Sequence, residues 1–181
     1  MKHPTKEECE RLLNEYKTPE HVKGHCREVA RTAYTIAKAL NEKGFGLDLE
    51  LITASGMLHD ILRTEEKHEK AGADLTESLG YEEESRIIRV HMTYSPFSVI
   101  EKVTETDMVC LGDRLVKEDS YVGLDARIEY IINKAKKGGH PEAEPFILEK
   151  KKDTMRFMDE IKRVIGKSVD ELMAENLKTE N

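Results

Sequence analysis

The stretch LELITASGMLHDIL, residues 49–62, is apolar on most sides of the helix that its composition predicts. A helix that is hydrophobic all round lies in the interior of a protein, so we expect this one to be central. His59 and Asp60 interrupt the apolar residues near its end. Burying a carboxylate next to an imidazole is costly unless both groups have partners, and a cation bound by both side chains is one such partner. A hydrogen-bonded core pair is the other interpretation.

Helices are also predicted on both sides of this stretch. Thr5 and Glu8 have the spacing of a capping box, which opens a first helix. Thr18 and Pro19 predict the start of a second helix, with Thr18 as the N-cap and Pro19 at the first helical position. The remaining predictions are Asp48 as the N-cap of the central helix, helices at about residues 66–79, 82–92, 105–116 and 124–137, one from Pro145 to residue 165, and one opened by a capping box at Ser168 and Glu171.

These patterns predict an all-α fold, built as a single helical bundle with additional C-terminal helices. No segment shows the period of two that is typical of a strand, and we find no internal repeat. The 181 residues are enough for one domain with a sizeable core, and a second full domain would be crowded. We therefore expect one domain at residues 1–140 and a helical extension at residues 141–181 that packs on its core.

Composition narrows the classes of function. The formal net charge of −7 argues against general nucleic-acid binding, which depends on Lys and Arg side chains that neutralise phosphates. Cys9, Cys26 and Cys110 form no C-x-x-C pair, so we expect reduced thiols. The polar N-terminus lacks the apolar segment of a signal peptide, and no apolar run approaches the roughly 20 residues of a membrane span. These features predict a cytoplasmic protein that does not enter the membrane.

A set of histidines and aspartates falls in order on five successive predicted helices. A single histidine among apolar neighbours is most simply a hydrogen-bonded core residue. Five unrelated buried polar groups, one on each helix, are a poorer explanation than one shared site. The set consists of His25, the His59-Asp60 pair, His68, His91 and Asp113.

The sequence around these residues resembles a known family. The matching segments are HCREVARTAYTIAKAL (25–40), GMLHDILR (56–63), HEKAGADLTESLG (68–80), RVH (89–91) and LGDRLV (111–116). Together they resemble the HD superfamily of metal-dependent phosphohydrolases over a core of about residues 22–117. The resemblance implies that the domain at residues 1–140 is an HD-type helical bundle.

The resemblance also implies a set of metal ligands. Asp60 would bridge two metals, one held with His25, His59 and Asp113, and the other held with His68 and His91. This set is similar to that of the six-ligand branch of the superfamily, which includes symmetrical diadenosine tetraphosphate hydrolases. Nitrogen and carboxylate ligands without thiolate suit one or two divalent ions of Fe, Mn, Co, Ni or Zn.

The implied reaction is hydrolysis of a phosphoester or phosphoanhydride bond by a metal-activated water. We expect a small phosphorylated substrate, namely a nucleotide or dinucleotide. Asp60 and Arg63 are the candidate catalytic residues, because Arg63 lies one turn after Asp60 on the same helical face and is placed to contact a phosphate. An ion pair that only orients Asp60 is the other interpretation of Arg63. Further candidates for substrate binding are Arg114, Lys117 and Tyr94.

Other functions fit the same residues. A nucleotidase or a cyclic-nucleotide phosphodiesterase would use the same metal site. A non-catalytic HD module would bind metal or nucleotide as a sensor, and a metal-free bundle would use the His-Asp set only as core polar residues. The departure from many family members at Arg63, where they carry lysine, leaves the substrate open, because the two side chains are not interchangeable. A homodimer is a candidate for the oligomeric state.

Overall fold

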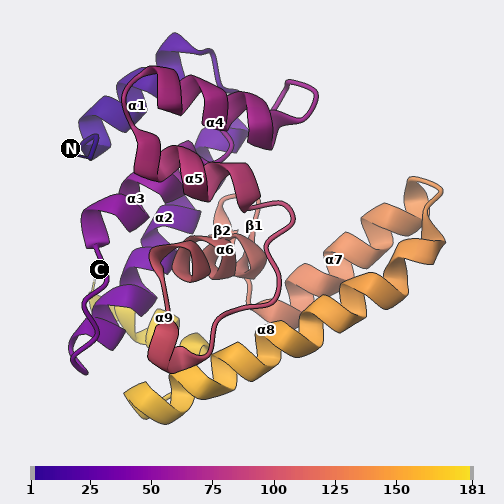
Figure 1. Ribbon diagram of the computed structural model, residues 1–181. Helices are drawn as coiled ribbons and strands as arrows, with labels where there is room; N and C mark the ends of the chain where they lie inside the picture. Colours follow the sequence, from indigo (N-terminus) through magenta and orange to yellow (C-terminus); the bar gives the residue numbers. More distant parts are fainter. Residues whose placement is uncertain (1–2, 180–181) are drawn as a thin grey trace.

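The computed structural model describes residues 3–179, and most of them are helical (Figure 1). The helices are α1 (Lys6–Glu15), α2 (Glu20–Asn41), α3 (Leu49–Leu58), α4 (His68–Ser78), α5 (Glu82–Val90), α6 (Glu105–Leu115), α7 (Leu124–Lys137), α8 (Glu144–Ile165) and α9 (Val169–Thr179), with short 3-10 helices η1 (Ile100–Lys102) and η2 (Pro141–Ala143). Two strands of two residues each, β1 (Val116–Lys117) and β2 (Ser120–Tyr121), pair antiparallel. The all-α prediction is therefore confirmed.

Two glycines allow α3 and α6 to pack closely on α2. A Cβ atom added at Gly56 of α3 would lie 2.7 Å from the Cα atom of Ala30. A Cβ atom added at Gly112 of α6 would lie 2.9 Å from the carbonyl oxygen of Val29. Both distances are too short for a side chain, so glycine sets the spacing of these three helices. Four of the six candidate ligands, His25, His59, Asp60 and Asp113, lie on or directly after these helices.

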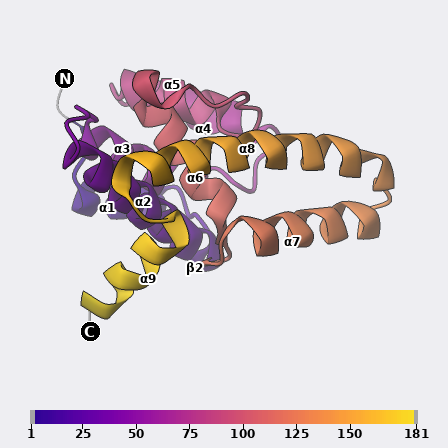
Figure 2. The same cartoon turned by 90° about the horizontal axis from the view of Figure 1, so that it is seen from below.

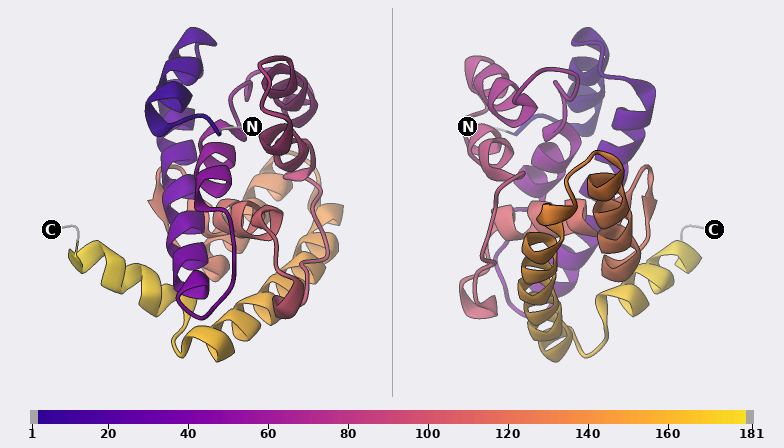
Figure 3. Two further views of the ribbon diagram at one scale, coloured as in Figure 1. Left: turned by 60° about the vertical axis from the view of Figure 1, so that its left-hand side comes forward. Right: turned by 90° about the vertical axis from the view of Figure 1, so that its right-hand side faces the viewer.

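The remaining helices form two hairpins and a terminal helix around this centre. In Figure 1, α4 and α5 lie side by side above α2 and α3, and α7 and α8 form a long hairpin that extends to one side. Figure 2 shows that the tip of this hairpin lies well away from the rest of the chain. Helix α9 lies at the end of the molecule opposite α4 and α5 (Figure 3). The base of α8 is anchored in the core, where the buried Phe157 stacks on Phe97 with ring centroids 4.8 Å apart.

Three local predictions are corrected by the structure. Thr18 does not cap α2, because Pro19 occupies the N-cap position and the Thr18 hydroxyl donates a hydrogen bond to the Ile61 carbonyl at 2.7 Å. Helix α3 ends at Leu58, earlier than predicted, and His59 and Asp60 lie in the turn that follows. The β1–β2 hairpin was not predicted, because strands of two residues are too short to show a period. The other capping predictions are confirmed for α1, α3 and α9.

Within residues 3–179, no helix combines the length and the apolar character needed to cross a membrane.

Candidate metal centre

Three of the six candidate ligands lie at the ends of helices. His59 is the C-cap residue of α3, and His91 is the C-cap residue of α5. His68 is the first residue of α4, and it follows Lys67, whose φ of 53° turns the chain into the helix. The remaining ligands are Asp60, which lies in the turn after α3, and two residues within helices, His25 in α2 and Asp113 in α6.

One side of the centre is formed by His25, His59, Asp60 and Asp113. His25 Nε2 lies 2.9 Å from Asp113 Oδ1, and His59 Nε2 lies 3.7 Å from the same oxygen. His59 Nε2 is also 3.6 Å from Asp60 Oδ2. Ligand atoms of His25, His59 and Asp60 all lie within 4.8 Å of one another, a separation that one metal ion can bridge.

The other side is formed by Asp60, His68 and His91. Asp60 Oδ1 lies 3.1 Å from His68 Nε2 and 3.4 Å from His91 Nε2. These three residues form a second group whose ligand atoms lie within 4.8 Å of one another. The imidazole of His91 joins the two sides, because its ring centroid is 5.1 Å from that of His59 and 5.5 Å from that of His68. Asp60 belongs to both groups, as expected for a bridging carboxylate.

Backbone carbonyls orient three of the histidines. The Nδ1 atoms of His25, His59 and His91 donate to the carbonyls of Glu118, Gly56 and Ile88 at 2.8, 2.8 and 2.7 Å. A carbonyl oxygen can only accept, so each Nδ1 carries a proton, and each Nε2 faces the centre. Metal-binding histidines usually donate their second ring nitrogen in this way.

The residues fit a bound cation. His59 Nε2, His91 Nε2 and Asp60 Oδ1 are buried, and none has a hydrogen-bond partner of acceptable geometry among the described residues. Buried polar atoms without partners are rare in native proteins and need an explanation such as an ion. These three atoms converge on one small region, and a divalent metal there would satisfy all of them.

The charge of the centre also suits a cation. Burial raises the pKa of Asp60, but the neighbouring imidazoles of His59, His68 and His91 outweigh this effect and hold its pKa well below the ordinary value. The pKa of Asp113 is likewise lowered, against the effect of burial. Burial lowers the pKa of His59, which favours the neutral ring. Burial also lowers the pKa of His25 and His91, but their contacts with Asp113 and Asp60 outweigh it and raise both pKa values. The centre therefore holds two ionised carboxylates and a neutral His59, and metal binding would release the protons of the other rings.

Arg63 lies at the edge of the centre. Its Nε atom is 3.4 Å from Asp60 Oδ2, and its Nη1 atom is 3.1 Å from His68 Nδ1. The side chain is 40% exposed, so the guanidinium is in contact with both the centre and the solvent. The ion pair with Asp60 and a contact with substrate are both compatible with this position.

The three other candidates for substrate binding lie farther along the chain. The Arg114 guanidinium donates to Thr154 Oγ1 and to the carbonyl of Tyr94, and it covers the ring of Phe97. The Tyr94 hydroxyl donates to Asp107 Oδ1 at 2.8 Å. Lys117 places its Nζ atom 4.8 Å from the ring centroid of Tyr130. Among the described residues, no hydrogen bond or ion pair joins these side chains to the six ligands, and their role in substrate binding stays a prediction.

The turn between β1 and β2 is a part of the site that sequence reasoning missed. Glu118 has a φ of 55°, and its carbonyl holds the His25 ring. Gly24 allows this approach, since a Cβ atom there would lie 3.1 Å from Asp119 Cβ. The polar run at residues 117–120 is a turn signal, but the sequence does not show which ring the turn contacts.

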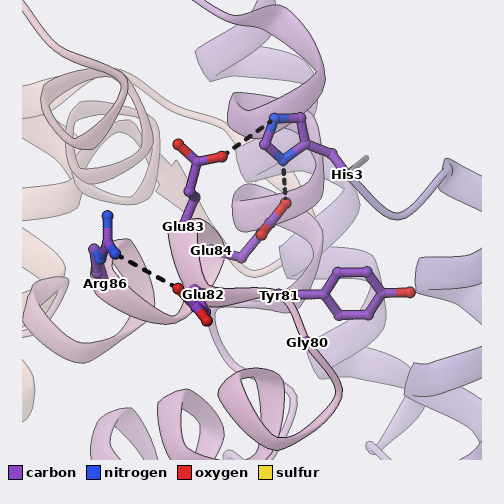
Figure 4. A pocket seen from close by; sticks show the side chains of 7 residues that line it. All are labelled: His3, Gly80, Tyr81, Glu82, Glu83, Glu84 and Arg86. Carbon is purple, nitrogen blue, oxygen red and sulfur yellow. Dashed lines mark hydrogen bonds and ion pairs between the residues drawn. The ribbon is translucent and has the colours of Figure 1, made fainter. Parts of the chain in front are cut away.

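A separate cavity of about 230 Å³ lies at the start of α5 (Figure 4). Figure 4 shows His3 between Glu83 and Glu84, and an ion pair between Arg86 and Glu82. Glu84 is buried and lies 2.6 Å from His3 Nδ1. Carboxylates dominate the lining, and the cavity is at the end of α5 opposite His91, so it does not suit a phosphorylated substrate.

Comparisons with known proteins give one family and two relatives. The chain is 28% identical over 145 residues to an uncharacterized protein of Methanocaldococcus jannaschii. The alignment covers 71% of this chain and 85% of that protein. It is 25% identical over 185 residues to a tRNA (cytidine(56)-2'-O)-methyltransferase of Thermoplasma volcanium. That alignment covers 93% of this chain and 50% of that enzyme. No solved structure matches.

The family match coincides with the centre. Residues 22–118 match the HD domain family, and this range is more than half of the chain and contains all six candidate ligands. HD domains bind divalent metals, and the family generally comprises metal-dependent phosphohydrolases. The chain therefore belongs to the HD domain family.

Proposed function

We propose that this chain is a metal-dependent hydrolase that cleaves a phosphoester or phosphoanhydride bond in a nucleotide or dinucleotide. The observation that carries the proposal is the convergence of His59 Nε2, His91 Nε2 and Asp60 Oδ1, three buried atoms without hydrogen-bond partners. In a metal-free core, each of these atoms would lower the stability of the folded state. Membership of the HD domain family supports the same chemistry.

Each side of the centre has its own set of ligands. His25, His59 and Asp113 would hold one divalent transition metal with Asp60, and His68 and His91 would hold a second one with the same carboxylate. This arrangement is the one expected for the six-ligand branch of the family. Bound metal supplies Lewis-acid charge at the phosphoryl oxygens and lowers the pKa of a water molecule toward neutrality.

The chain's own residues orient the substrate and the ligands. Asp60 keeps its negative charge because the surrounding imidazoles lower its pKa, so it stays a competent ligand near neutral pH. The carbonyls of Glu118, Gly56 and Ile88 fix the ring orientation of three histidines. Arg63 is half in solvent beside Asp60 and is assigned to donate hydrogen bonds to a phosphate oxygen, for which a guanidinium is well suited.

The test is the metal content of the purified protein beside that of Asp60→Asn. Asn keeps the shape of the side chain but removes the shared negative charge, so we expect stoichiometric transition metal in the wild type and its loss in the variant. Asp159→Asn is the matched control, because Asp159 is exposed on α8 and lies outside the centre. Elemental analysis of all three proteins would be followed by a hydrolysis screen of phosphomonoesters, nucleotides and dinucleoside polyphosphates.

A wild-type protein that holds no metal after reconstitution would refute the proposal. Metal that remains in Asp60→Asn at the wild-type level would show that the ion lies elsewhere. A metal-loaded protein that hydrolyses none of these phosphate compounds would favour the non-catalytic HD module instead.

A further inference from the structure

Four basic side chains near the base of the α7–α8 hairpin have no carboxylate within 4.0 Å among residues 3–179. This basic cluster consists of Arg114 of α6, Lys117 of β1, Arg127 of α7 and Lys150 of α8. Arg114 and Arg127 are the two arginines of the described chain without such a partner. Acidic residues outnumber basic ones by 36 to 29, so two arginines without a carboxylate partner are unusual for this chain.

Contacts connect the members of the cluster in two pairs. Lys117 Nζ lies 4.8 Å and Arg127 Cζ lies 5.5 Å from the ring centroid of Tyr130, so two cations contact one ring. On the other side, Thr154 Oγ1 accepts a hydrogen bond from Arg114 at 3.2 Å and donates one to the Lys150 carbonyl at 2.8 Å. The like charges of Lys117 and Arg127, held at one ring, repel one another, and an anion between them would reverse the effect.

The guanidinium of Arg127 lacks one hydrogen-bond partner. Its Nε atom is buried and has no hydrogen-bond partner among the described residues. A buried donor without an acceptor is destabilising, and a guanidinium is the side chain that matches the oxygens of a phosphate most closely.

Two members of the cluster are adjacent to residues of the metal centre along the chain. Arg114 directly follows the ligand Asp113. Lys117 directly precedes Glu118, whose carbonyl holds the ligand His25 at 2.8 Å. Lys151 of α8 pairs with Asp125 of α7 at 2.7 Å, which places the start of α7 against the Lys150 segment of α8. Helix α6 and strand β1, which carry Arg114 and Lys117, therefore connect the centre to the base of the hairpin along the chain.

We propose that the basic cluster, with Lys117 and Arg127 as its contact residues, is a second anion site that binds a phosphate of the substrate other than the one being hydrolysed. This inference rests on the proposed function and narrows the substrate to molecules with at least two phosphates. Lys150 adds a further contact. Arg114 contributes charge alone, because its donors are engaged by Thr154 and Tyr94. The base of the α7–α8 hairpin then has a role in substrate choice.

The test measures binding of inorganic tripolyphosphate by titration calorimetry to the full-length protein as purified. Lys117→Met/Arg127→Met removes two positive charges at the cluster. Lys43→Met/Arg163→Met is the matched control, because both residues are exposed and their removal changes the net charge equally. We expect the Kd for tripolyphosphate to rise at least about tenfold in the cluster variant and to change less than about twofold in the control. Any removal of metal by the probe affects all proteins alike, so the comparison isolates the cluster.

A conservative variant keeps the proposal testable if the double variant fails to fold. Arg127→Lys retains the charge and the contact with Tyr130 but lacks the Nε donor, so we expect weaker binding with unchanged helical circular dichroism.

The outcomes separate this inference from the proposed function. Equal tripolyphosphate affinity in the cluster variant and the control would overturn the anion site, even if the protein holds metal and hydrolyses phosphate compounds. A selective loss of affinity in the cluster variant supports the anion site, even if the wild-type protein proves to hold no metal.

Discussion

His3 connects the N-terminal segment to the starts of α3 and α5. Its Nδ1 atom lies 2.6 Å from the buried Glu84, and its Nε2 atom lies 3.3 Å from Asp48 and 3.9 Å from Glu83. Burial lowers the pKa of His3, but the hydrogen bond with Glu84 and the three carboxylate charges outweigh this, and the net pKa is raised above 6.5. The protonated ring therefore stabilises the folded state.

The sign of this linkage gives a pH prediction for His3→Gln. A histidine with a raised pKa contributes stability that is fully present below its unfolded pKa of about 6.5 and is lost as the pH rises through the folded value. We expect His3→Gln to lower the free energy of unfolding by about 1–2 kcal/mol at about pH 6, and by clearly less at about pH 9. Urea unfolding at the two pH values measures the difference. An equal loss at both values would show that the imidazolium does not act on stability.

At the scale of residues, the sequence predicted which side chains gather at the centre, but not what holds them. His25, His59 and His91 were identified by type and by position on apolar helices. Their carbonyl partners could not be predicted, because every residue has a carbonyl and only the fold selects one. The backbone of Glu118 is the clearest case, since it acts on His25 from 93 residues away.

At the scale of elements, the imidazoles of His59 and His91 explain why α3 and α5 end where they do. His59 Nδ1 donates to the Gly56 carbonyl, and His91 Nδ1 donates to the Ile88 carbonyl, each three residues earlier. In a continuing α-helix those carbonyls would accept from the amides of Asp60 and Met92. The side chain competes with the helix, so α3 stops before the end that its apolar pattern predicts.

The contact between α2 and α3 gives a prediction for Gly56→Ala. Alanine in a helix interior is ordinarily more favourable than glycine by about 1 kcal/mol. Here the new methyl group would lie 2.7 Å from Ala30 Cα, so we expect a net loss of about 1–3 kcal/mol in the free energy of unfolding. Gly46→Ala is the control, since nothing lies within 4 Å of its Cβ position. A Gly56→Ala protein as stable as the wild type would mean that α3 shifts freely on α2.

At the scale of the whole molecule, the C-terminal helices share the core of the HD domain. Phe157 and Ile161 of α8 and Met173 of α9 are buried in the same apolar cluster as Ile36 of α2 and Leu111 of α6. The sequence predicted the helices after Pro145, but periodicity alone did not show which face of α2 or α6 they cover. We therefore propose that residues 141–181 unfold together with the core.

Phe157→Ala tests this proposal. Phe157 is fully buried and stacks on Phe97, so its truncation should lower the free energy of unfolding by about 3–5 kcal/mol and preserve a single transition. Phe146→Ala is the matched control, because Phe146 is 74% exposed near the hairpin tip and its truncation should change stability by no more than about 0.5 kcal/mol. Chemical denaturation followed by circular dichroism measures both. Two separate transitions in the Phe157→Ala protein would favour an independent C-terminal unit.

The carbonyls that accept hydrogen bonds from His25, His59 and His91 affect which positions of this centre tolerate substitution during evolution. Their oxygens belong to the main chain, so replacing the side chains of Glu118, Gly56 or Ile88 does not delete them. Ring orientation therefore depends on the path of the backbone, and among the three positions Glu118 is free to change its amino acid, whereas packing restricts Gly56 and Ile88. A mutational scan should therefore find the ligands intolerant of change, while Glu118, which is exposed, accepts any side chain that tolerates its left-handed backbone.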